Sequence, residues 1–158
     1  LISSLSLSQI EFCTRDLFLQ KKTYFVVFPY YNEDAVVKEA RRASVISKKK
    51  IQVLGITDLQ DFYSKAKYIK KKPKQSVAII LTDNNLLNPA TTATIINYLN
   101  KEKIPVISTR PADTFKGAFI SIFENKGSIE VHLNKITGDI IGFKIPDKFL
   151  KKSIVDVE

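Results

Sequence analysis

Short apolar runs alternate with amphipathic segments along most of this chain, and the alternation predicts its fold. Val77–Leu81 is an unbroken apolar run, the pattern of a strand buried on both faces of a parallel sheet. Asn88 and Pro89 then supply a helix N-cap and a proline at the first helical position. The expected buried stripe of this helix is Ile95, Ile96 and Leu99. Ile104–Ile107 returns as a second buried strand, so the unit is strand, helix, strand.

The same order precedes this unit. Thr23–Phe28 and Ile51–Ile56 are predicted strands because they are rich in β-branched and aromatic residues. A helix is expected after each strand, since Asn32 and Thr57 are good N-cap residues. Residues 23–109 therefore have the order βαβαβαβ with short connections. This order predicts an α/β fold, a parallel sheet with flanking helices and right-handed crossovers.

The two ends of the chain follow different patterns. Residues 1–22 are expected to supply an N-terminal helix, which a capping box of Ser8 and Glu11 would open. Residues 110–158 are expected to form a C-terminal β-hairpin and a tail. The hairpin would turn at Glu124–Gly127, where a glycine stands at a position suited to left-handed backbone. All 158 residues are expected to form a single domain.

The net charge suggests a nucleic-acid partner, but the distribution of the charge along the chain argues against one. The net charge is +9, a balance found in nucleic-acid-binding proteins. The lysines, however, fall in scattered runs such as Lys48–Lys50 and Lys70–Lys72, mostly where helices should end. Few of the 25 basic residues are arginine, which grips phosphates and base edges best. A solvated surface is the favoured interpretation, and no nucleic-acid partner is expected.

The motifs of common enzymes do not occur in this sequence. Its five glycines form no phosphate-binding loop of the Walker or dinucleotide type. His132 is the single histidine and Cys13 the single cysteine, so the sequence nominates no catalytic set and no metal pair. Asp83 follows a strand as in receiver domains, but the first strand is not followed by the acidic pair that they need. We therefore expect no enzyme activity, no metal and no cofactor.

Polar residues cluster where the predicted parallel strands end, and this is where open α/β sheets usually bind ligands. Tyrosine offers an aromatic wall, and the amides and hydroxyls could hold a polar small molecule such as an amino acid. The alternative is that these side chains only satisfy the backbone of turns. The candidate ligand-binding residues are Tyr30, Tyr31, Asn32, Thr57, Thr82, Asp83, Asn84, Asn85, Ser108 and Thr109.

Several segments resemble one branch of the ABC-transporter solute-binding proteins, the branch of tryptophan- and tyrosine-type importers. The Asp83-Asn84 pair before a helix and the Pro105-Val106 strand are similar to the central segment of that family. The ending, with Asn134 and then Gly142–Pro146, is similar to its usual C-terminus. The resemblance implies one lobe of a periplasmic-binding-protein-like fold. It implies an extracytoplasmic domain that binds a small amino-acid-like molecule for sensing or transport.

Two departures from that family leave an alternative open. The chain has sequence for little more than one of the two lobes, and the hairpin at Glu124–Gly127 replaces a long helix. Gly117–Leu150 also resembles the YfiR family of small periplasmic regulators, which would act by protein contact without a small ligand. Either resemblance implies a location outside the cytoplasmic membrane, and any membrane anchor is expected in residues that are not in this chain. A permease, a sensor protein or a second copy is the expected protein partner.

Overall fold

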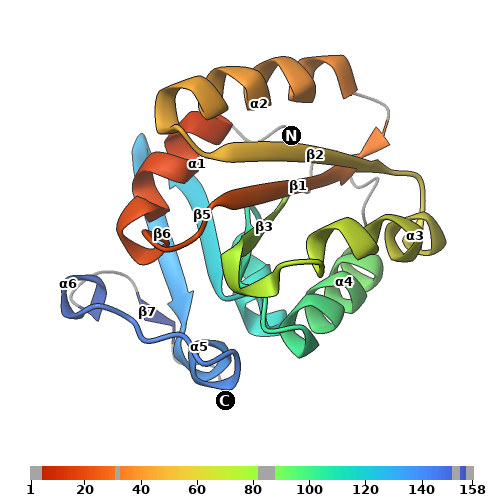
Figure 1. Cartoon of the computed structure of the whole chain (residues 1–158). Helices are drawn as coiled ribbons and strands as arrows, with labels where there is room; N and C mark the ends of the chain where they lie inside the picture. Colours follow the sequence, from red (N-terminus) through yellow and green to blue (C-terminus); the bar gives the residue numbers. More distant parts are fainter. Residues whose placement is uncertain (1–4, 31–32, 82–87, 151–153, 156–158) are drawn as a thin grey trace.

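The computed structural model describes residues 5–30, 33–81, 88–150 and 154–155, and these contain a seven-stranded sheet (Figure 1). The strand order is β2-β1-β3-β4-β5-β6-β7. Neighbouring strands pair in parallel except β5 and β6, which pair antiparallel. The parallel sheet and the C-terminal hairpin are therefore confirmed. The strands are β1 Thr23–Pro29, β2 Lys50–Ile56, β3 Ser76–Ile80, β4 Val106–Ser108, β5 Ile120–Asn125, β6 Ser128–Asn134 and β7 Ile154–Val155.

Helices cover both faces of the sheet (Figure 1). The α-helices are α1 Leu7–Thr14, α2 Glu33–Ser47, α3 Leu59–Ile69, α4 Pro89–Lys101, α5 Lys135–Ile140 and α6 Asp147–Leu150. The 3-10 helices within the described residues are η1 Arg15–Leu17, η3 Pro73–Gln75 and η5 Pro111–Lys116. The helices α1 and α2 pack on one face, and α3 and α4 pack on the other. In the described part of the chain, no helix is both long and apolar enough to cross a bilayer.

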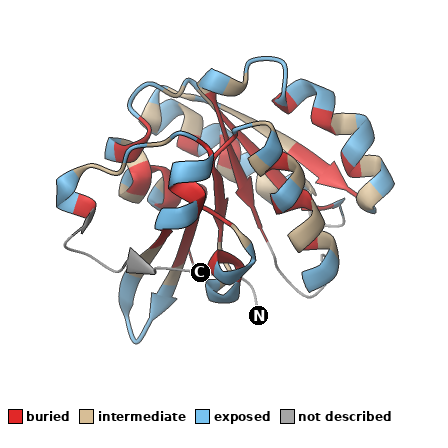
Figure 2. Cartoon of the chain, turned by 90° about the horizontal axis from the view of Figure 1, so that it is seen from below, coloured by how far each residue is buried: buried red, intermediate tan, exposed pale blue. Residues whose placement is uncertain are grey.

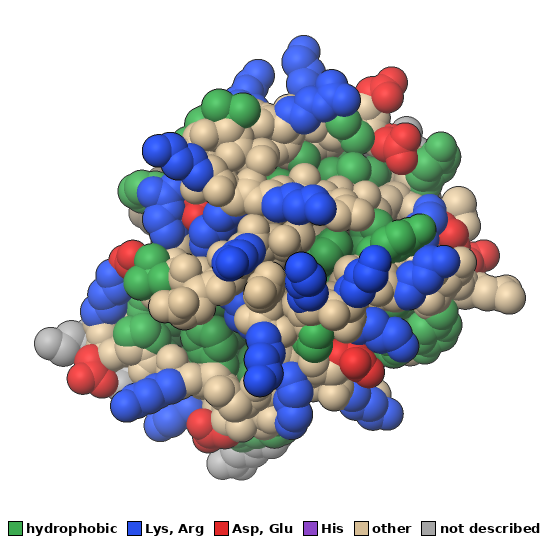
Figure 3. Space-filling model, viewed as in Figure 1, with side chains coloured by type: hydrophobic (Ala, Val, Ile, Leu, Met, Phe, Trp, Pro, Cys, Tyr) green, Lys and Arg blue, Asp and Glu red, His purple; other side chains and the backbone are tan. Residues whose placement is uncertain are grey.

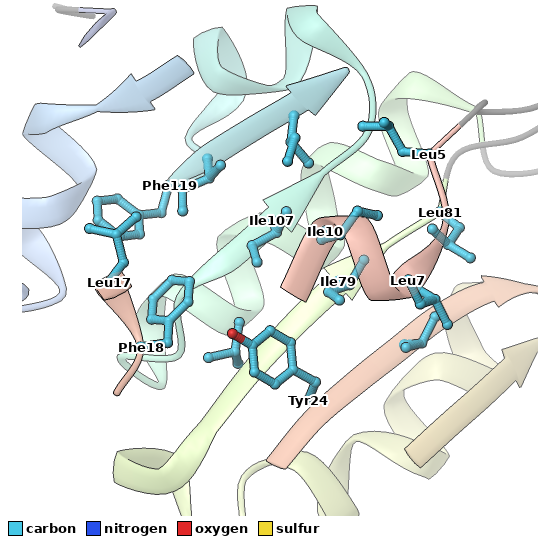
Figure 4. Packing of buried hydrophobic residues seen from close by; sticks show 14 of the residues in the cluster. Leu5, Leu7, Ile10, Leu17, Phe18, Tyr24, Ile79, Leu81, Ile107 and Phe119 are labelled. Carbon is cyan, nitrogen blue, oxygen red and sulfur yellow. The ribbon is translucent and has the colours of Figure 1, made fainter. Parts of the chain in front are cut away.

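Each face of the sheet has its own apolar core. Under α1, Ile10 and Phe18 pack against Tyr24 and Ile79 from the central strands (Figure 4). On the other face, the predicted stripe of α4 is fully buried. The residues of β1 and β3 are buried almost throughout, with side chains in both cores, as their unbroken apolar runs predict (Figure 2).

The N-terminal helix is real, but its predicted start is wrong. The capping box consists of Ser6 and Gln9: Ser6 Oγ accepts from the Gln9 N–H at 3.1 Å, and Gln9 Oε1 accepts from the Ser6 N–H at 2.8 Å. Glu11, which the spacing placed in a capping box, is instead 1% exposed. Its carboxylate pairs with the Arg15 guanidinium at 2.7 Å. A local spacing rule cannot show that a helix will bury a carboxylate with a partner.

The hairpin turns where the sequence predicts, whereas the segment before it differs from the expected loop. Lys126 and Gly127 join β5 to β6 with φ values of 52° and 82°, the left-handed pair that suits a two-residue hairpin turn. After β4 the chain forms the 3-10 helix η5, which ends at Gly117 with φ of 102°. The left-handed glycine redirects the chain from η5 into β5.

Candidate ligand-binding site

The strand order reverses between β1 and β3. The chain adds β2 on one side of β1 and then returns to place β3 and β4 on the other side. In open α/β sheets, ligands bind outside the carboxyl ends of the strands at such a switch point. Tyr30 follows β1 directly and Leu81 follows β3, so the switch lies between these two chain segments. The sequence predicts a ligand site at this edge of the sheet, and the strand order places the switch point between β1 and β3.

Six predicted site residues lie outside the residues that the structure describes, and their part in the site stays a prediction. The four that are described divide into two groups. Tyr30 and Thr57 follow adjacent strands, because Pro29 pairs with Ile56, and both side chains are exposed at the edge. Ser108 is the last residue of β4, the strand next to β3, and Thr109 follows it. Both side chains are less exposed than those of Tyr30 and Thr57. The residues outside the description are Tyr31, Asn32, Thr82, Asp83, Asn84 and Asn85.

The ring of Tyr30 lies directly over the backbone of Gly55. A Cβ atom at Gly55 would approach Cδ1 of Tyr30 to 2.8 Å and Cζ of Phe28 to 3.1 Å. Any side chain at this position would therefore have to displace the ring. A glycine inside a strand often marks such a close approach. The glycine within the predicted strand Ile51–Ile56 was the available signal, and sequence reasoning missed it.

The side chain of Lys65 contacts both the Tyr30 ring and the backbone of Gly55. Lys65 Nζ lies 5.9 Å from the centroid of the Tyr30 ring. It donates to the Gly55 carbonyl at 2.6 Å and to Asp61 Oδ2 at 3.2 Å. The ammonium group thus joins the end of β2 to the first turns of α3, beside the aromatic ring. Its position four residues after Asp61 is a helical ion-pair spacing, so the pair could have been found in the sequence.

Hydrogen bonds fix the backbone between β2 and α3. The Thr57 N–H donates to Asp61 Oδ2 at 3.0 Å, and the Asp61 N–H donates to Asp58 Oδ1 at 2.7 Å. The first of these bonds, helped by Lys65, holds the pKa of Asp61 below its ordinary value. The cap of α3 is Asp58 and not Thr57, one residue later than predicted. Thr57 keeps its own side chain exposed at the edge.

Ser108 takes part in a buried network instead of facing the edge. Its side chain is fully buried, and its hydroxyl donates to Asp113 Oδ2 at 2.5 Å. Asp113 is also fully buried within η5, and Lys116 Nζ lies 4.0 Å from its other carboxylate oxygen. Ser108 Oγ further accepts from the Arg110 N–H at 3.1 Å. These bonds position the segment after β4, which leaves the half-buried Thr109 and Arg110 beside the edge.

Three α-helices of the described residues, α2, α3 and α4, begin at this edge, and α2 has Glu33 and Asp34 in its first turn. The N-terminus of α3 is capped by Asp58, and that of α4 by Asn88, whose Oδ1 accepts from the Thr91 N–H at 2.9 Å. The positive end of each helix dipole points to the carboxyl ends of the strands. Such ends favour a carboxylate or another anion. The edge therefore combines an aromatic face, exposed hydroxyl groups, helix N-termini and the carboxylates of the first turns of α2 and α3.

The described residues do not gather into a metal centre. No group of three or more His, Cys, Asp or Glu side chains within them could hold a metal ion. His132 lies on β6, where Nε2 is 3.0 Å from Glu130 Oε1 and the ring packs edge-on against Phe123. The histidine thus sits on the hairpin, with a carboxylate and an aromatic ring as its neighbours.

Solved structures share this fold. The chain superposes on a substrate-binding protein with adhesive properties from Clostridium difficile, CD0873 in its ligand-free open form, with a TM-score of 0.78 and 16% identity. A conserved domain protein from Vibrio cholerae gives 0.76 and 16%, and an ABC domain from Streptococcus pneumoniae in complex with L-Trp gives 0.71 and 14%. No protein-family model matches the sequence, and no curated protein matches it. The chain thus has the α/β fold of a substrate-binding-protein lobe.

The chain corresponds to part of each of these structures. Between 90% and 99% of it is aligned, and it spans about three fifths of each neighbour: 61%, 60% and 59%.

Proposed function

We propose that this chain is a non-enzymatic, extracytoplasmic solute-binding domain that binds a small, polar, amino-acid-like molecule at the carboxyl edge of its sheet. It would serve sensing or transport. The observation that carries the proposal is the placement of Tyr30 directly after β1, one of the two strands that flank the switch point, with its ring over Gly55 of the neighbouring β2 and beside Lys65. An aromatic ring held in one place by a glycine is a prepared wall for a flat or apolar ligand group.

The chemistry of the edge suits an amino acid. A ligand carboxylate would face the N-terminus of α4, where the helix dipole favours negative charge and the first turn holds no acidic side chain. The exposed hydroxyl of Thr57, which also bonds to Asp61, can accept from a ligand ammonium group. The side chain of the ligand would lie against the Tyr30 ring. The L-Trp bound to the Streptococcus pneumoniae neighbour is a ligand of this class and supports the choice.

A single lobe covers only part of such a ligand. The neighbouring structures are longer than this chain, and small-molecule sites usually enclose most of the ligand surface. We infer that a second lobe, a second copy of the chain or a membrane permease or sensor protein closes the site. Affinity for the lone domain should then be modest, in the range of about 0.1–1 mM.

The test is binding of L-Trp and a panel of other amino and aromatic acids, measured by thermal shift and then by calorimetry. Tyr30→Ala should weaken binding by about tenfold, because it removes the aromatic wall. Tyr63→Ala is the matched control: Tyr63 is 45% exposed against 51% for Tyr30, but it packs on Phe62 and Tyr98 away from the edge. This control should bind as the unchanged protein does.

A second variant tests the geometry without removing the ring. Gly55→Ala should weaken binding while the domain still folds, because the new methyl group must displace the half-exposed Tyr30 ring. Equal binding by the Tyr30, Gly55 and Tyr63 variants would place the site elsewhere. If no ligand stabilises the unchanged protein at millimolar concentration, the ligand-binding proposal fails. The YfiR-like alternative, a regulatory module that acts by protein contact, would then be favoured.

A further inference from the structure

A pocket of about 560 Å³ lies at the opposite edge of the sheet from the candidate ligand-binding site. The first residues of three adjacent strands line it: Thr23, Lys50 and Ser76, which are register partners across β1, β2 and β3. The Lys22 N–H donates to the Gln75 carbonyl at 2.9 Å, and the Lys50 N–H donates to the Lys22 carbonyl at 3.1 Å. These bonds continue the sheet to the pocket rim and fix the backbone around it.

The lining is strongly basic. Lys22, Lys50, Lys71 and Lys72 all line the pocket, and none of its lining residues is Asp or Glu. The carboxyl end of α3 lies nearby and opposes this charge with about half an elementary negative charge. Four ammonium groups outweigh that contribution. Lys and Arg side chains gather over the middle of the face that carries β1, β2 and α3 (Figure 3).

Uncharged groups complete the lining. The ring of Tyr68 is half-exposed at the wall, and the buried ring of Phe25 lies at the base. The amides of Gln52 and Gln75 add donors and acceptors. The volume falls within the range of small-molecule sites, about 300–1,000 Å³. A pocket with several cations, two amides and an aromatic wall is suited to a compact polyanion and too small for a nucleic-acid duplex.

We propose that this pocket binds clustered phosphate groups, carried either by a free small molecule or by a lipid headgroup. Lysine ammonium groups bind phosphates as point charges, and several lysines around one cavity act on the same ligand. The site is separate from the carboxyl edge, so ligands could occupy both at once. Four of the lysines that make this chain basic would then have a specific ligand.

The first experiment measures binding of inorganic tripolyphosphate to the whole domain by calorimetry at physiological salt. A double variant, Lys22→Gln with Lys72→Gln, should reduce the affinity by about tenfold or more. The matched control is Lys38→Gln with Arg42→Gln, which removes the same net charge from exposed positions on α2. The control should bind as the unchanged protein does. No binding, or an equal loss in both double variants, would overturn the proposal.

The second experiment identifies the carrier of the phosphate groups. Vesicles of phosphatidylcholine with cardiolipin, whose headgroup carries two phosphates, should bind the unchanged protein, and tripolyphosphate should compete, if the source is a lipid headgroup. Tripolyphosphate binding without vesicle binding indicates a free small molecule. Both results retain the pocket. Binding of a duplex DNA in preference to tripolyphosphate would contradict it, because a duplex cannot enter the cavity. Loss of amino-acid binding at the carboxyl edge would leave this result unchanged, so the two proposals fail separately.

Discussion

At the residue scale, a buried ion pair and a buried phenol under α1 affect the stability of the core. The ammonium group of Lys49 lies 3.7 Å from Glu11 Oε2 and donates to the Phe18 carbonyl at 3.0 Å. It also lies 5.0 Å from the centroid of the Tyr24 ring. Glu11 therefore has two cationic neighbours, Lys49 and Arg15, inside an otherwise apolar core. Removing one partner of such a pair leaves a buried charge without compensation and is strongly destabilising.

Tyr24 gives this core a pH dependence. Burial raises the pKa of its phenol above the ordinary value, so the hydroxyl stays neutral in the folded protein when the unfolded chain would ionise. Stability from this group is complete below the ordinary pKa, near 10, and is lost as the pH rises above it. The free energy of unfolding should fall by up to about 1.4 kcal/mol for each pH unit above roughly 10.

The measurement is urea unfolding between pH 8 and about 11.5, compared with the Tyr24→Phe variant. Burial lowers the pKa of Lys49, which raises stability with pH over the same range, so the difference between the two proteins isolates the phenol. The variant should lose less stability on the alkaline side. Parallel curves for the two proteins would show that Tyr24 ionises equally in the folded and unfolded states.

Helix caps illustrate the scale of secondary-structure elements. The pair Asn88 and Pro89 is confirmed as the N-cap and first residue of α4, because both choices follow from local backbone chemistry. The caps of α1 and α3 shift by one or two residues from their predicted positions. Ser, Thr and Asp are all good caps, so neighbouring candidates compete. Packing of the apolar stripe then selects which of these residues caps the helix.

Replacement of the α4 cap should have a small and measurable cost. Asn88→Ala should reduce the free energy of unfolding by about 1 kcal/mol, because the Thr91 N–H loses its acceptor. Asn97→Ala makes the same chemical change at an exposed position within α4. It should be neutral or stabilising by up to about 0.7 kcal/mol, since alanine has the higher helix propensity. Denaturant unfolding of both variants checks the prediction, and an equal effect would show that the cap is not used.

Charge belongs to the scale of the whole molecule. The net charge is +9, yet several lysines are already engaged with the fold. Lys21 Nζ donates to the Lys74 carbonyl at 3.0 Å, and Lys103 Nζ donates to the Ile140 carbonyl at 2.7 Å. Lys65 is held by Gly55 and Asp61. These three ammonium groups bond to backbone carbonyls or pair with an acid, so they do not form a continuous row of free charges for a phosphate backbone.

Binding to a duplex DNA of random sequence should therefore be weak. We expect a Kd weaker than about 100 μM at physiological salt, and a shallow dependence on salt, because few phosphates are neutralised together. Fluorescence anisotropy of a labelled duplex at low and physiological salt measures both quantities. Submicromolar binding with a steep salt slope would contradict the solvated-surface interpretation.

The sequence by itself determined the order of elements and the faces that they bury. Unbroken apolar runs require burial on both faces, and this is satisfied by parallel strands with helices on both sides. The four predicted strands from Thr23 to Ile107 are all found in parallel pairing. The hairpin was equally predictable, since Gly127 suits the left-handed backbone of a tight turn. These features depend on local patterns, which a single sequence displays.

Only the tertiary structure decided which of the polar residues at strand ends share a surface. Strand order placed β1 beside β3 and made their carboxyl ends the switch point, an outcome that helix and strand patterns do not specify. Packing seated Tyr30 on Gly55, while Ser108 was drawn into a buried bond with Asp113. The register of β1, β2 and β3 likewise assembled the basic pocket from lysines far apart in the chain. Contacts between distant segments set these positions, because each depends on where the whole sheet places its neighbours.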